Sequence, residues 1–352
     1  MRSGRIGVVL LQLGTPDAPT APALRRYLRQ FLSDRRVIDL NRVLWWLTLN
    51  LAVLPRRPKR SAALYRRIWT PEGSPLLVTS HAQASKVAAV LDARLGEPVP
   101  VAVAMRYGQP STAHAIDALL AQGVDRIIAM PMYPQYASAS TGSSLEELFG
   151  VIGRLRVVPS VRVVPPYYDD PAYIEALGAV TAESLARLSF EPERVIVSFH
   201  GLPARYVAEG DPYQTHCEAT VERLSSAMGW PRDKVLLVYQ SLFGREVWLQ
   251  PYADETLKSL PSRGVSRVAV MCPGFTADCL ETIEEMGMTN RELFLASGGS
   301  EYHFVPCLND HPAWIDAMAS LIEREAAGWA RGEGQDTSVV WADAHSHRRA
   351  VR

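Results

Sequence analysis

The sequence predicts an α/β protein made of two similar, doubly wound domains with parallel sheets. Short apolar runs of strand length alternate with helix-like stretches, which is the pattern of βαβ units. The runs cover residues 6–13, 99–105, 126–133, 195–199, 235–239 and 268–272. Two pairs of segments also recur in the same order along the chain: 6–16 resembles 195–203, and 122–134 resembles 263–275. We therefore expect the two halves to share one architecture.

The boundary between the two domains is predicted near residues 163–171. Paired prolines and paired aspartates interrupt the periodicity there, as they do at turns and linkers. We expect the first domain to cover residues 1–165 and the second to cover residues 166–310.

The C-terminal part of the chain contains one more helical pattern and then a polar segment. The pattern over residues 311–330 begins with plausible helix-start chemistry, and we expect it to return to the first domain. The segment 331–352 is polar and aperiodic, which is typical of a mobile tail. Its His345 and His347 are more typical of solvated chain than of a metal site.

Charge and cysteine content exclude several classes of function. The chain has 352 residues with 37 basic and 37 acidic side chains, so no basic stripe is available for nucleic acid. The four cysteines are widely spaced and form no C-x-x-C pair, so neither a zinc knuckle nor a disulfide framework is indicated. They are compatible with a reducing cytoplasm, where we expect the protein to be located.

The segment 43–54 is apolar but cannot cross a bilayer. It has 12 residues, including Thr48 and Asn50, whereas a spanning helix needs roughly 20 apolar residues. The basic sequence PRRPKR follows it at residues 55–60. An apolar ridge with a basic flank is typical of a segment that rests on an anionic membrane surface. The alternative is a buried core helix.

The residues that follow the apolar runs are the candidates for a ligand site, because ligands of open α/β sheets bind outside the carboxyl ends of the strands. These segments are aromatic and mixed in charge, which suits a large flat ligand with a polar rim. The sequence contains neither a G-x-G-x-x-G after a strand nor a P-loop, so dinucleotide and ATP chemistry lack their usual signature.

His200 is the sharpest of these candidates. It directly follows the apolar run 195–199, where a strand end would aim it into the crevice. With an ordinary pKa near ~6.5, imidazole readily serves as a neutral proton acceptor or a metal ligand. The alternative is a histidine that merely hydrogen-bonds a neighbouring carbonyl.

A row of acids forms the second candidate. If a helix begins near Asp278, then Asp278, Glu281 and Glu285 share one helical face. Asp278 and Glu281 could instead form a capping box. The like-charged pair Glu281 and Glu285 costs a few tenths of a kcal/mol, which a cation or a shared proton would offset. Together with His200, these carboxylates suit a divalent metal such as Fe(II).

The chain resembles the ferrochelatase family, which inserts ferrous iron into protoporphyrin IX in the last step of haem synthesis. The matching segments are VVLLQLGTPDAP, LYRRIWTPEGSPL, AMRYGQPS, YPQYASASTGSS, SFHGLPARYVAEGDPY, YQSLFGREVWLQPYADETL, PGFTADCLETIEEM and CLNDHPAW. The resemblance implies two Rossmann-like domains, each with a four-stranded parallel sheet, and a cleft between them. It implies porphyrin and Fe(II) as substrates, with no tightly bound cofactor.

The resemblance also implies roles for individual residues. His200 matches the histidine assigned to proton abstraction or metal binding, and Glu281 matches the acid that faces it across the porphyrin. Glu285 continues the acidic path. We therefore expect His200 and Glu281 to stand on opposite sides of one slot. The expected porphyrin-binding residues are Leu13, Arg57, Tyr65, Ser74, Arg106, Tyr107 and Trp248.

The chain departs from the family pattern in ways that matter for function. Some relatives hold a [2Fe-2S] cluster with cysteines from their C-terminus and from the segment matching 135–141. This chain has no cysteine in either place, so we expect no cluster. Leu13 replaces the Met or Tyr that relatives carry near the metal, which removes an axial contact. The ridge 43–54 falls in the family's porphyrin lip, which favours an exposed edge with peripheral contact to the inner face of the membrane.

Two alternatives to the iron chelatase remain at the level of sequence. The first is a non-catalytic tetrapyrrole or haem carrier with the same two-domain clamp, because fold does not fix function. A carrier gains little from like charges beside its ligand, so the row of acids argues against it. The second is a chelatase that acts on coproporphyrin or on a cobalt-accepting ring. The hydrophobic lip favours the less polar protoporphyrin.

Overall fold

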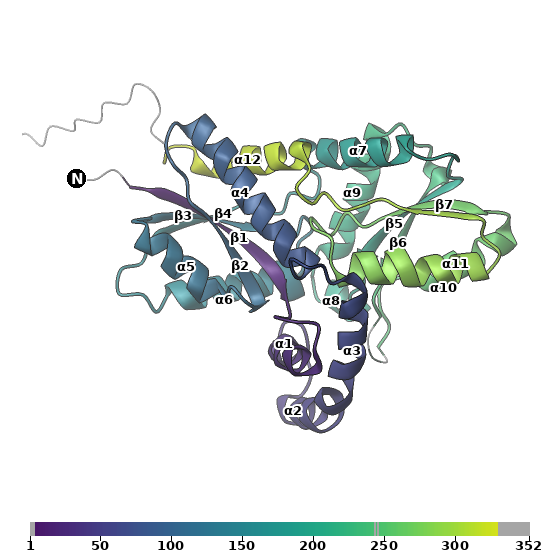
Figure 1. Cartoon of the computed structure of the whole chain (residues 1–352), viewed down its shortest axis with the longest axis horizontal. Coiled ribbons are helices and arrows are strands. Elements are labelled where there is room, and N and C mark those ends of the chain that lie inside the picture. The colour runs from purple at the N-terminus through teal and green to yellow at the C-terminus, as the bar shows by residue number, and fades with distance from the viewer. Residues whose placement is uncertain (1–3, 243, 245, 330–352) are drawn as a thin grey trace, which may run out of the picture.

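The structure is a computed structural model that describes residues 4–242, 244 and 246–329. It contains two four-stranded sheets in which every neighbouring pair is parallel, with helices packed on both (Figure 1). The predicted tail 331–352, with His345 and His347, lies outside the described residues.

The two sheets have the same topology. The first contains β1 (Ile6–Thr15), β2 (Val101–Gly108), β3 (Arg126–Pro131) and β4 (Ser160–Val163) in the order β2-β1-β3-β4. The second contains β5 (Arg194–His200), β6 (Val235–Gln240), β7 (Arg267–Met271) and β8 (Glu301–Phe304) in the order β6-β5-β7-β8. The identical order explains the repeated segments and confirms the predicted fold class.

All six apolar runs form strands, but no apolar run marks β4 or β8. Both are four-residue edge strands whose side chains are mostly half-buried or exposed. They carry no continuous apolar run because only one of their edges is paired.

Helices cover the sheets in the usual βαβ manner. In the first half they are α4 (Pro75–Leu95), α5 (Thr112–Ala121), a π-helical turn η2 (Ser138–Gly142) and α6 (Ser143–Ile152). In the second half they are α7 (Pro171–Ala186), α8 (Ala204–Ala208), α9 (Tyr213–Ala227), η3 (Arg232–Lys234), α10 (Ala253–Ser259), η4 (Pro261–Arg263), the π-helix η5 (Leu280–Thr289) and α11 (Asn290–Ala296). The chain then continues into α12 (Pro312–Ala326).

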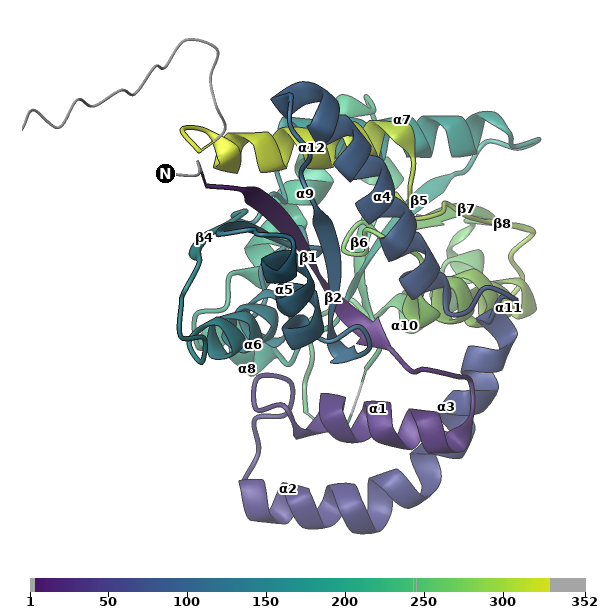
Figure 2. The ribbon, with the colours of Figure 1, turned by 60° about the vertical axis from the view of Figure 1, so that its left-hand side comes forward.

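A helical lobe is inserted between β1 and α4. It consists of α1 (Ala21–Ser33), α2 (Arg42–Thr48), the π-helical turn η1 (Leu49–Val53) and α3 (Leu54–Ile68). Figure 2 shows α2 at the far side of α1, away from the sheets. The predicted ridge 43–54 therefore forms the outer edge of this lobe.

The ridge has a buried face and an exposed face. Trp45, Leu49 and Leu54 pack into the lobe's own core, whereas Val43, Leu44, Trp46 and Leu51 are between 62% and 70% exposed. The alternative prediction of a buried core helix therefore holds only for the inner face of the ridge. Among the described residues, no helix combines the length and apolar composition that crossing a bilayer requires.

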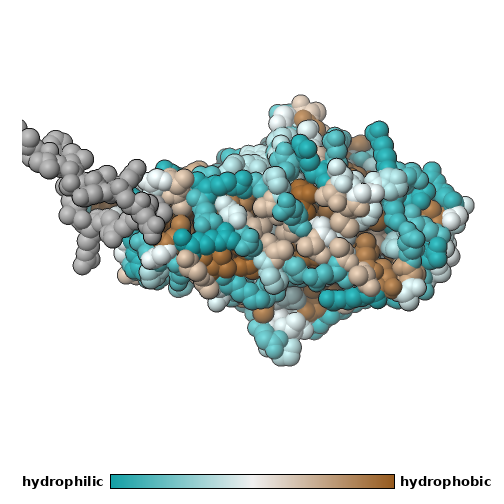
Figure 3. All heavy atoms as spheres, turned by 90° about the horizontal axis from the view of Figure 1, so that it is seen from above, coloured by the Kyte–Doolittle hydropathy of each residue, from teal (hydrophilic) through white to brown (hydrophobic). Residues whose placement is uncertain are grey.

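Helix α12 packs on α4 of the first half and α7 of the second. Its Trp314 has no exposed surface and packs against Tyr167 and Tyr173, with ring centroids 5.9 and 6.0 Å away. The face that α4, α7 and α12 form is hydrophilic with small scattered apolar areas (Figure 3). One continuous apolar core includes Val8 of β1, Val197 of β5 and Trp314. The domain limits at 165 and 310 stay a prediction.

Replacement of Trp314 tests the contribution of this shared core. We expect Trp314→Ala to lower the free energy of unfolding by about 3–5 kcal/mol, because it removes the largest fully buried side chain and leaves a cavity. Urea denaturation followed by circular dichroism would measure this. Glu325→Ala, on the same helix, should change stability by less than about 0.5 kcal/mol. Equal effects of the two changes would contradict the assignment of Trp314 to the core.

Candidate active site

A cleft of about 1200 Å³, counting the space at its open mouth, lies at the carboxyl ends of the strands. Its walls come from β1 and the lobe in the first half and from the segments after β5, β6 and β7 in the second. The lining is largely apolar and aromatic, including Leu13, Tyr27, Phe31, Tyr65, Leu76, Tyr133, Leu202, Trp248, Phe275 and Leu280. This is the position that an open α/β sheet predicts for its ligand.

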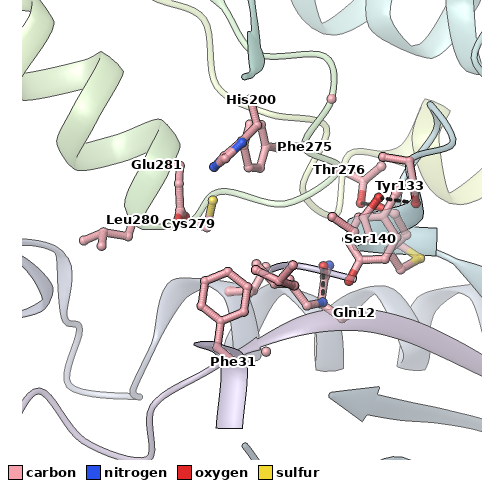
Figure 4. Close-up of a pocket in the computed structure, with 18 of the residues that line it drawn as sticks. Gln12, Phe31, Tyr133, Ser140, His200, Phe275, Thr276, Cys279, Leu280 and Glu281 are labelled. Atoms are coloured by element: carbon pink, nitrogen blue, oxygen red, sulfur yellow. Dashed lines mark hydrogen bonds between the residues drawn. The ribbon is translucent and has the colours of Figure 1, made fainter. Parts of the chain in front are cut away.

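His200 ends β5 and projects its ring into this cleft (Figure 4). Its Nδ1 lies 2.7 Å from the carbonyl oxygen of Gly201. A carbonyl only accepts hydrogen bonds, so Nδ1 must donate, and the neutral ring then carries its lone pair on Nε2. His200 was predicted to be either a proton acceptor or metal ligand, or a histidine that merely hydrogen-bonds a carbonyl. Each interpretation applies to a different ring nitrogen. One nitrogen is satisfied by a carbonyl, and the other is available for chemistry.

Glu281 also lines the cleft, but the local structure that holds it differs from the prediction. A helix does begin near Asp278, at Leu280, but it is a π-helix. Its capping box is formed by Cys279 and Thr282 rather than by Asp278 and Glu281. The Asp278 carboxylate instead accepts hydrogen bonds from Thr282 Oγ1 at 2.9 Å and Asn309 Nδ2 at 2.7 Å.

His200 and Glu281 both reach the cleft from the second half. Figure 4 shows them pointing into the same space, with Gln12 and Phe31 facing them from the first half. That they face each other across a bound porphyrin stays a prediction. The site brings an imidazole and a carboxylate into one cleft.

Glu285 lies behind Glu281 rather than on the cleft wall. Its carboxylate accepts hydrogen bonds from the backbone N–H of Ser241, at 2.8 Å, and from Ser241 Oγ. Burial raises the pKa of this carboxyl above 4.5, and the charge of Glu281 acts in the same direction, while Ser241 and His200 act against it. Ser241 has φ of 65°, a left-handed conformation uncommon outside glycine.

Of the predicted porphyrin-binding residues, Leu13, Tyr65, Ser74 and Trp248 line the cleft. The ring of Trp248 lies 6.5 Å from that of His200, between centroids. Arg57 of α3 is half-buried, and burial lowers the pKa of its guanidinium while the charge of Glu281 raises it.

Arg106 and Tyr107 are not among the residues on the cleft wall. Tyr107 has no exposed surface. Its hydroxyl donates to Asp34 Oδ2 at 2.8 Å, and Arg106 Nη2 donates to the same oxygen at 2.6 Å. Asp34 follows α1, so this network supports the base of the lobe from behind the cleft.

Several residues that line the cleft were not predicted from the sequence. Gln12 interrupts the apolar run of β1 near its carboxyl end, and a polar side chain in a buried strand was the available signal. Tyr27, Phe31 and Tyr133 gave no such signal, since aromatic residues are usual in a core. Cys279 lies beside Glu281, and burial raises the pKa of its thiol, so the thiol stays protonated.

No group of three or more His, Cys, Asp or Glu side chains that could hold a metal ion occurs in the part of the chain that the structure describes. Among the residues that line the cleft, His200 supplies an imidazole and Glu281 a carboxylate. Two such ligands would leave most of a metal's coordination positions to other groups.

Solved structures of metal chelatases share this architecture. The chelatase SirB from Bacillus subtilis, solved with Fe3+, superposes with a TM-score of 0.55 over 92% of this chain and 96% of its own, at 13% identity. The sirohydrochlorin chelatase SirB from Bacillus subtilis subspecies spizizenii, solved with cobalt, gives a TM-score of 0.52 at 11% identity. At such identities the likeness establishes the chelatase fold alone.

The sequence comparisons identify the family. The family model described as Ferrochelatase matches residues 5–326. The ferrochelatase of Bradyrhizobium diazoefficiens is 48% identical over 92% of this chain and 94% of its own length, and that of Pectobacterium atrosepticum is 46% identical over 92% and 99%. The chain therefore belongs to the ferrochelatase family of metal-porphyrin chelatases. The predicted resemblance is confirmed.

The effect of Ser241 on the pKa of Glu285 can be tested. Ser241→Ala removes the Oγ donor that favours the carboxylate, so the pKa of Glu285, already above 4.5, should rise further. Carbon-13 NMR titration of the glutamate side chains would measure the change. The exposed Ser262→Ala variant should leave this titration where it is in the unmodified protein. A fall in the Glu285 pKa on losing Ser241 Oγ would contradict the arrangement.

Proposed function

We propose that the protein inserts Fe(II) into protoporphyrin IX and releases protohaem. Family membership supports metal insertion into a porphyrin. The choice of ring and metal and the roles of the residues are our proposal. The observation that carries it is the His200 ring, whose Nε2 is free in an apolar cleft beside the carboxylate of Glu281.

Metal insertion exchanges one divalent cation for two pyrrole protons. In the proposed mechanism, Nε2 of neutral His200 accepts a proton from a pyrrole N–H as the ring nitrogens turn to the metal. The resulting imidazolium lies next to Glu281, whose carboxylate stabilises the positive charge and takes the proton onward. Glu285, with its raised pKa, is the next acceptor on a path away from the cleft. The relay carries one proton at a time, so it operates twice for each metal ion inserted.

His200 and Glu281 would also be the first protein groups to hold the incoming iron. An imidazole and a carboxylate without a thiolate bind Fe(II) less firmly than a closed protein site does. The remaining positions would be filled by water and then by the pyrrole nitrogens. Such a site favours transfer of iron as a substrate over its retention as a cofactor.

The cleft lining supports protoporphyrin over a more carboxylate-rich ring such as coproporphyrin. Its walls are mostly aromatic and aliphatic, so each additional buried carboxylate would lose hydration without a matching cation. Hydroxyl groups gather at the α3 side, where Thr15 Oγ1 lies 2.7 Å from Ser74 Oγ and Tyr65 lies nearby. We propose that the propionates of protoporphyrin lie at this end, near Arg57.

Replacement of His200 tests the proposed base. His200→Ala should slow metal insertion by about 10²-fold or more, because general-base catalysis contributes that much. Porphyrin binding should change little. Loss of the free-porphyrin absorption bands on anaerobic addition of Fe(II) measures insertion, and quenching of protein fluorescence measures binding. His114→Ala, an exposed histidine on α5, is the matched control. If the unmodified protein binds porphyrin and never metalates it, the carrier interpretation is correct.

We further propose that residues 43–60 rest on the inner face of the cytoplasmic membrane. The exposed side chains of the ridge are followed directly by the exposed Arg56, Lys59 and Arg60, which suit an anionic lipid surface. The lobe that carries the ridge also forms one wall of the cleft, through Phe31 and Tyr65. A poorly soluble porphyrin could then enter the cleft from the membrane.

Trp46→Ser and Leu51→Ser test this contact. Each removes apolar surface that would insert among the lipids, so each should weaken vesicle binding by about fivefold. Co-sedimentation with phosphatidylcholine vesicles, with and without phosphatidylglycerol, measures binding. Val157→Ser is the matched control, because Val157 is 81% exposed and lies far along the chain from the ridge. Equal losses in all three variants would contradict a membrane contact through the ridge.

A further inference from the structure

The helix that carries Glu281 and Glu285 depends on its neighbours for its shape. It is π-helical over ten residues, Leu280–Thr289, whereas π geometry in proteins is mostly limited to single turns. Side chains from outside the helix bind its carbonyls: Gln240 Nε2 donates to the Glu281 carbonyl at 2.8 Å, and the Tyr302 hydroxyl donates to the Met286 carbonyl at 2.6 Å. These contacts come from β6 and β8 of the second half.

A contact from the first half reaches the same helix through Glu284. The Glu284 side chain is 6% exposed, and its Oε1 accepts hydrogen bonds from Arg67 Nη1 at 2.5 Å and from Thr289 Oγ1 at 3.0 Å. Arg67 stands in the last turn of α3, where the helix dipole favours a cation. Its second Nη group donates to Glu292 of α11 at 3.3 Å. Figure 2 shows α3 ending close to α11.

The three acids of the π-helix therefore have different surroundings. Glu281 lines the cleft, and Glu285 is held by Ser241. Glu284 is nearly fully buried on the side that faces α3, where Leu280, Ile283 and Met288 pack against the lobe core. Without Arg67, Glu284 would be a buried carboxylate with a hydroxyl as its remaining partner, and it would have to reach water or take up a proton.

We propose that Arg67 is a positioning residue for metal insertion. By holding Glu284 against α3, it fixes the rotation of the π-helix and so directs Glu281 into the cleft beside His200. The inference rests on the proposed function for its catalytic consequence. If Glu284 turned outward, the helix would rotate about its axis and carry Glu281 with it, because the two residues are three positions apart in one rigid element. Arg67 itself has no contact with the reacting groups.

Arg67→Met tests the role of this ion pair, because it keeps the apolar stem and removes the cation. We expect the turnover of metal insertion to fall by about tenfold, while the affinity for porphyrin changes by less than about twofold, since misplacing a reacting group costs rate more than binding. Arg67→Lys should restore at least half of the turnover. Arg66→Met, the adjacent exposed arginine, is the matched control and should leave turnover unchanged.

The double variant Arg67→Met/Glu284→Gln distinguishes positioning from general loss of stability. The uncharged amide that replaces the Glu284 carboxylate needs no cation, so we expect turnover to return to within about threefold of the unmodified protein. Hydrogen exchange of peptides covering residues 278–290 gives a second readout that does not require activity. Exchange there should be faster in Arg67→Met than in Arg66→Met, even if the unmodified protein proves to be a carrier. Equal turnover and equal exchange in these two variants, or no recovery in the double variant, would overturn the proposal.

Discussion

The hydrogen bond between His200 Nδ1 and the Gly201 carbonyl fixes the orientation of the imidazole in the cleft. It occupies one ring nitrogen and leaves the other as an acceptor, so the neutral imidazole has one orientation for its lone pair. Gly201 makes this possible because a Cβ at that position would lie 2.9 Å from the Gln240 carbonyl oxygen and 3.1 Å from Trp248. The close approach in turn lets the Gly201 N–H donate to the Gln240 carbonyl at 2.7 Å. The sequence His-Gly after a buried strand is therefore one unit, in which the glycine sets the direction of the histidine.

The acidic wall is built on the same strand end. Gln240, opposite His200 in the β5 and β6 pairing, uses its amide to hold the Glu281 carbonyl, and its Oε1 accepts from Ser198 Oγ at 2.7 Å. The next residue, Ser241, holds Glu285. His200 and the two glutamates are thus joined through two consecutive residues, Gln240 at the end of β6 and Ser241 directly after it. Their separation is set by the sheet register, which is more rigid than a loop could be by itself.

Much of the fold could be predicted from the sequence, because parallel strands buried on both faces are continuous apolar runs. The edge strands β4 and β8 could not, since each is only four residues long and partly exposed. His200 was identifiable from its position after a strand. The π-helix was not, because α- and π-helices use the same residue types and differ in which distant groups bind their carbonyls. Arg106 and Tyr107 were expected in the cleft but lie behind it. Both donate hydrogen bonds to Asp34, which is 72 positions away from Arg106 in the sequence, and such a distant contact could not be predicted.

The burial of all four thiols has a consequence for a protein whose family handles ferrous iron. Cys217, Cys272, Cys279 and Cys307 are buried, and loss of hydration raises the pKa of each thiol. The thiolate is the form that attacks peroxide, and burial disfavours the thiolate at every one of these positions. Peroxide formed when ferrous iron meets oxygen would therefore find few reactive thiolates in this fold. Cys279 lines the cleft and so lies near the proposed iron site, but the raised pKa of its thiol keeps it in the less reactive protonated form.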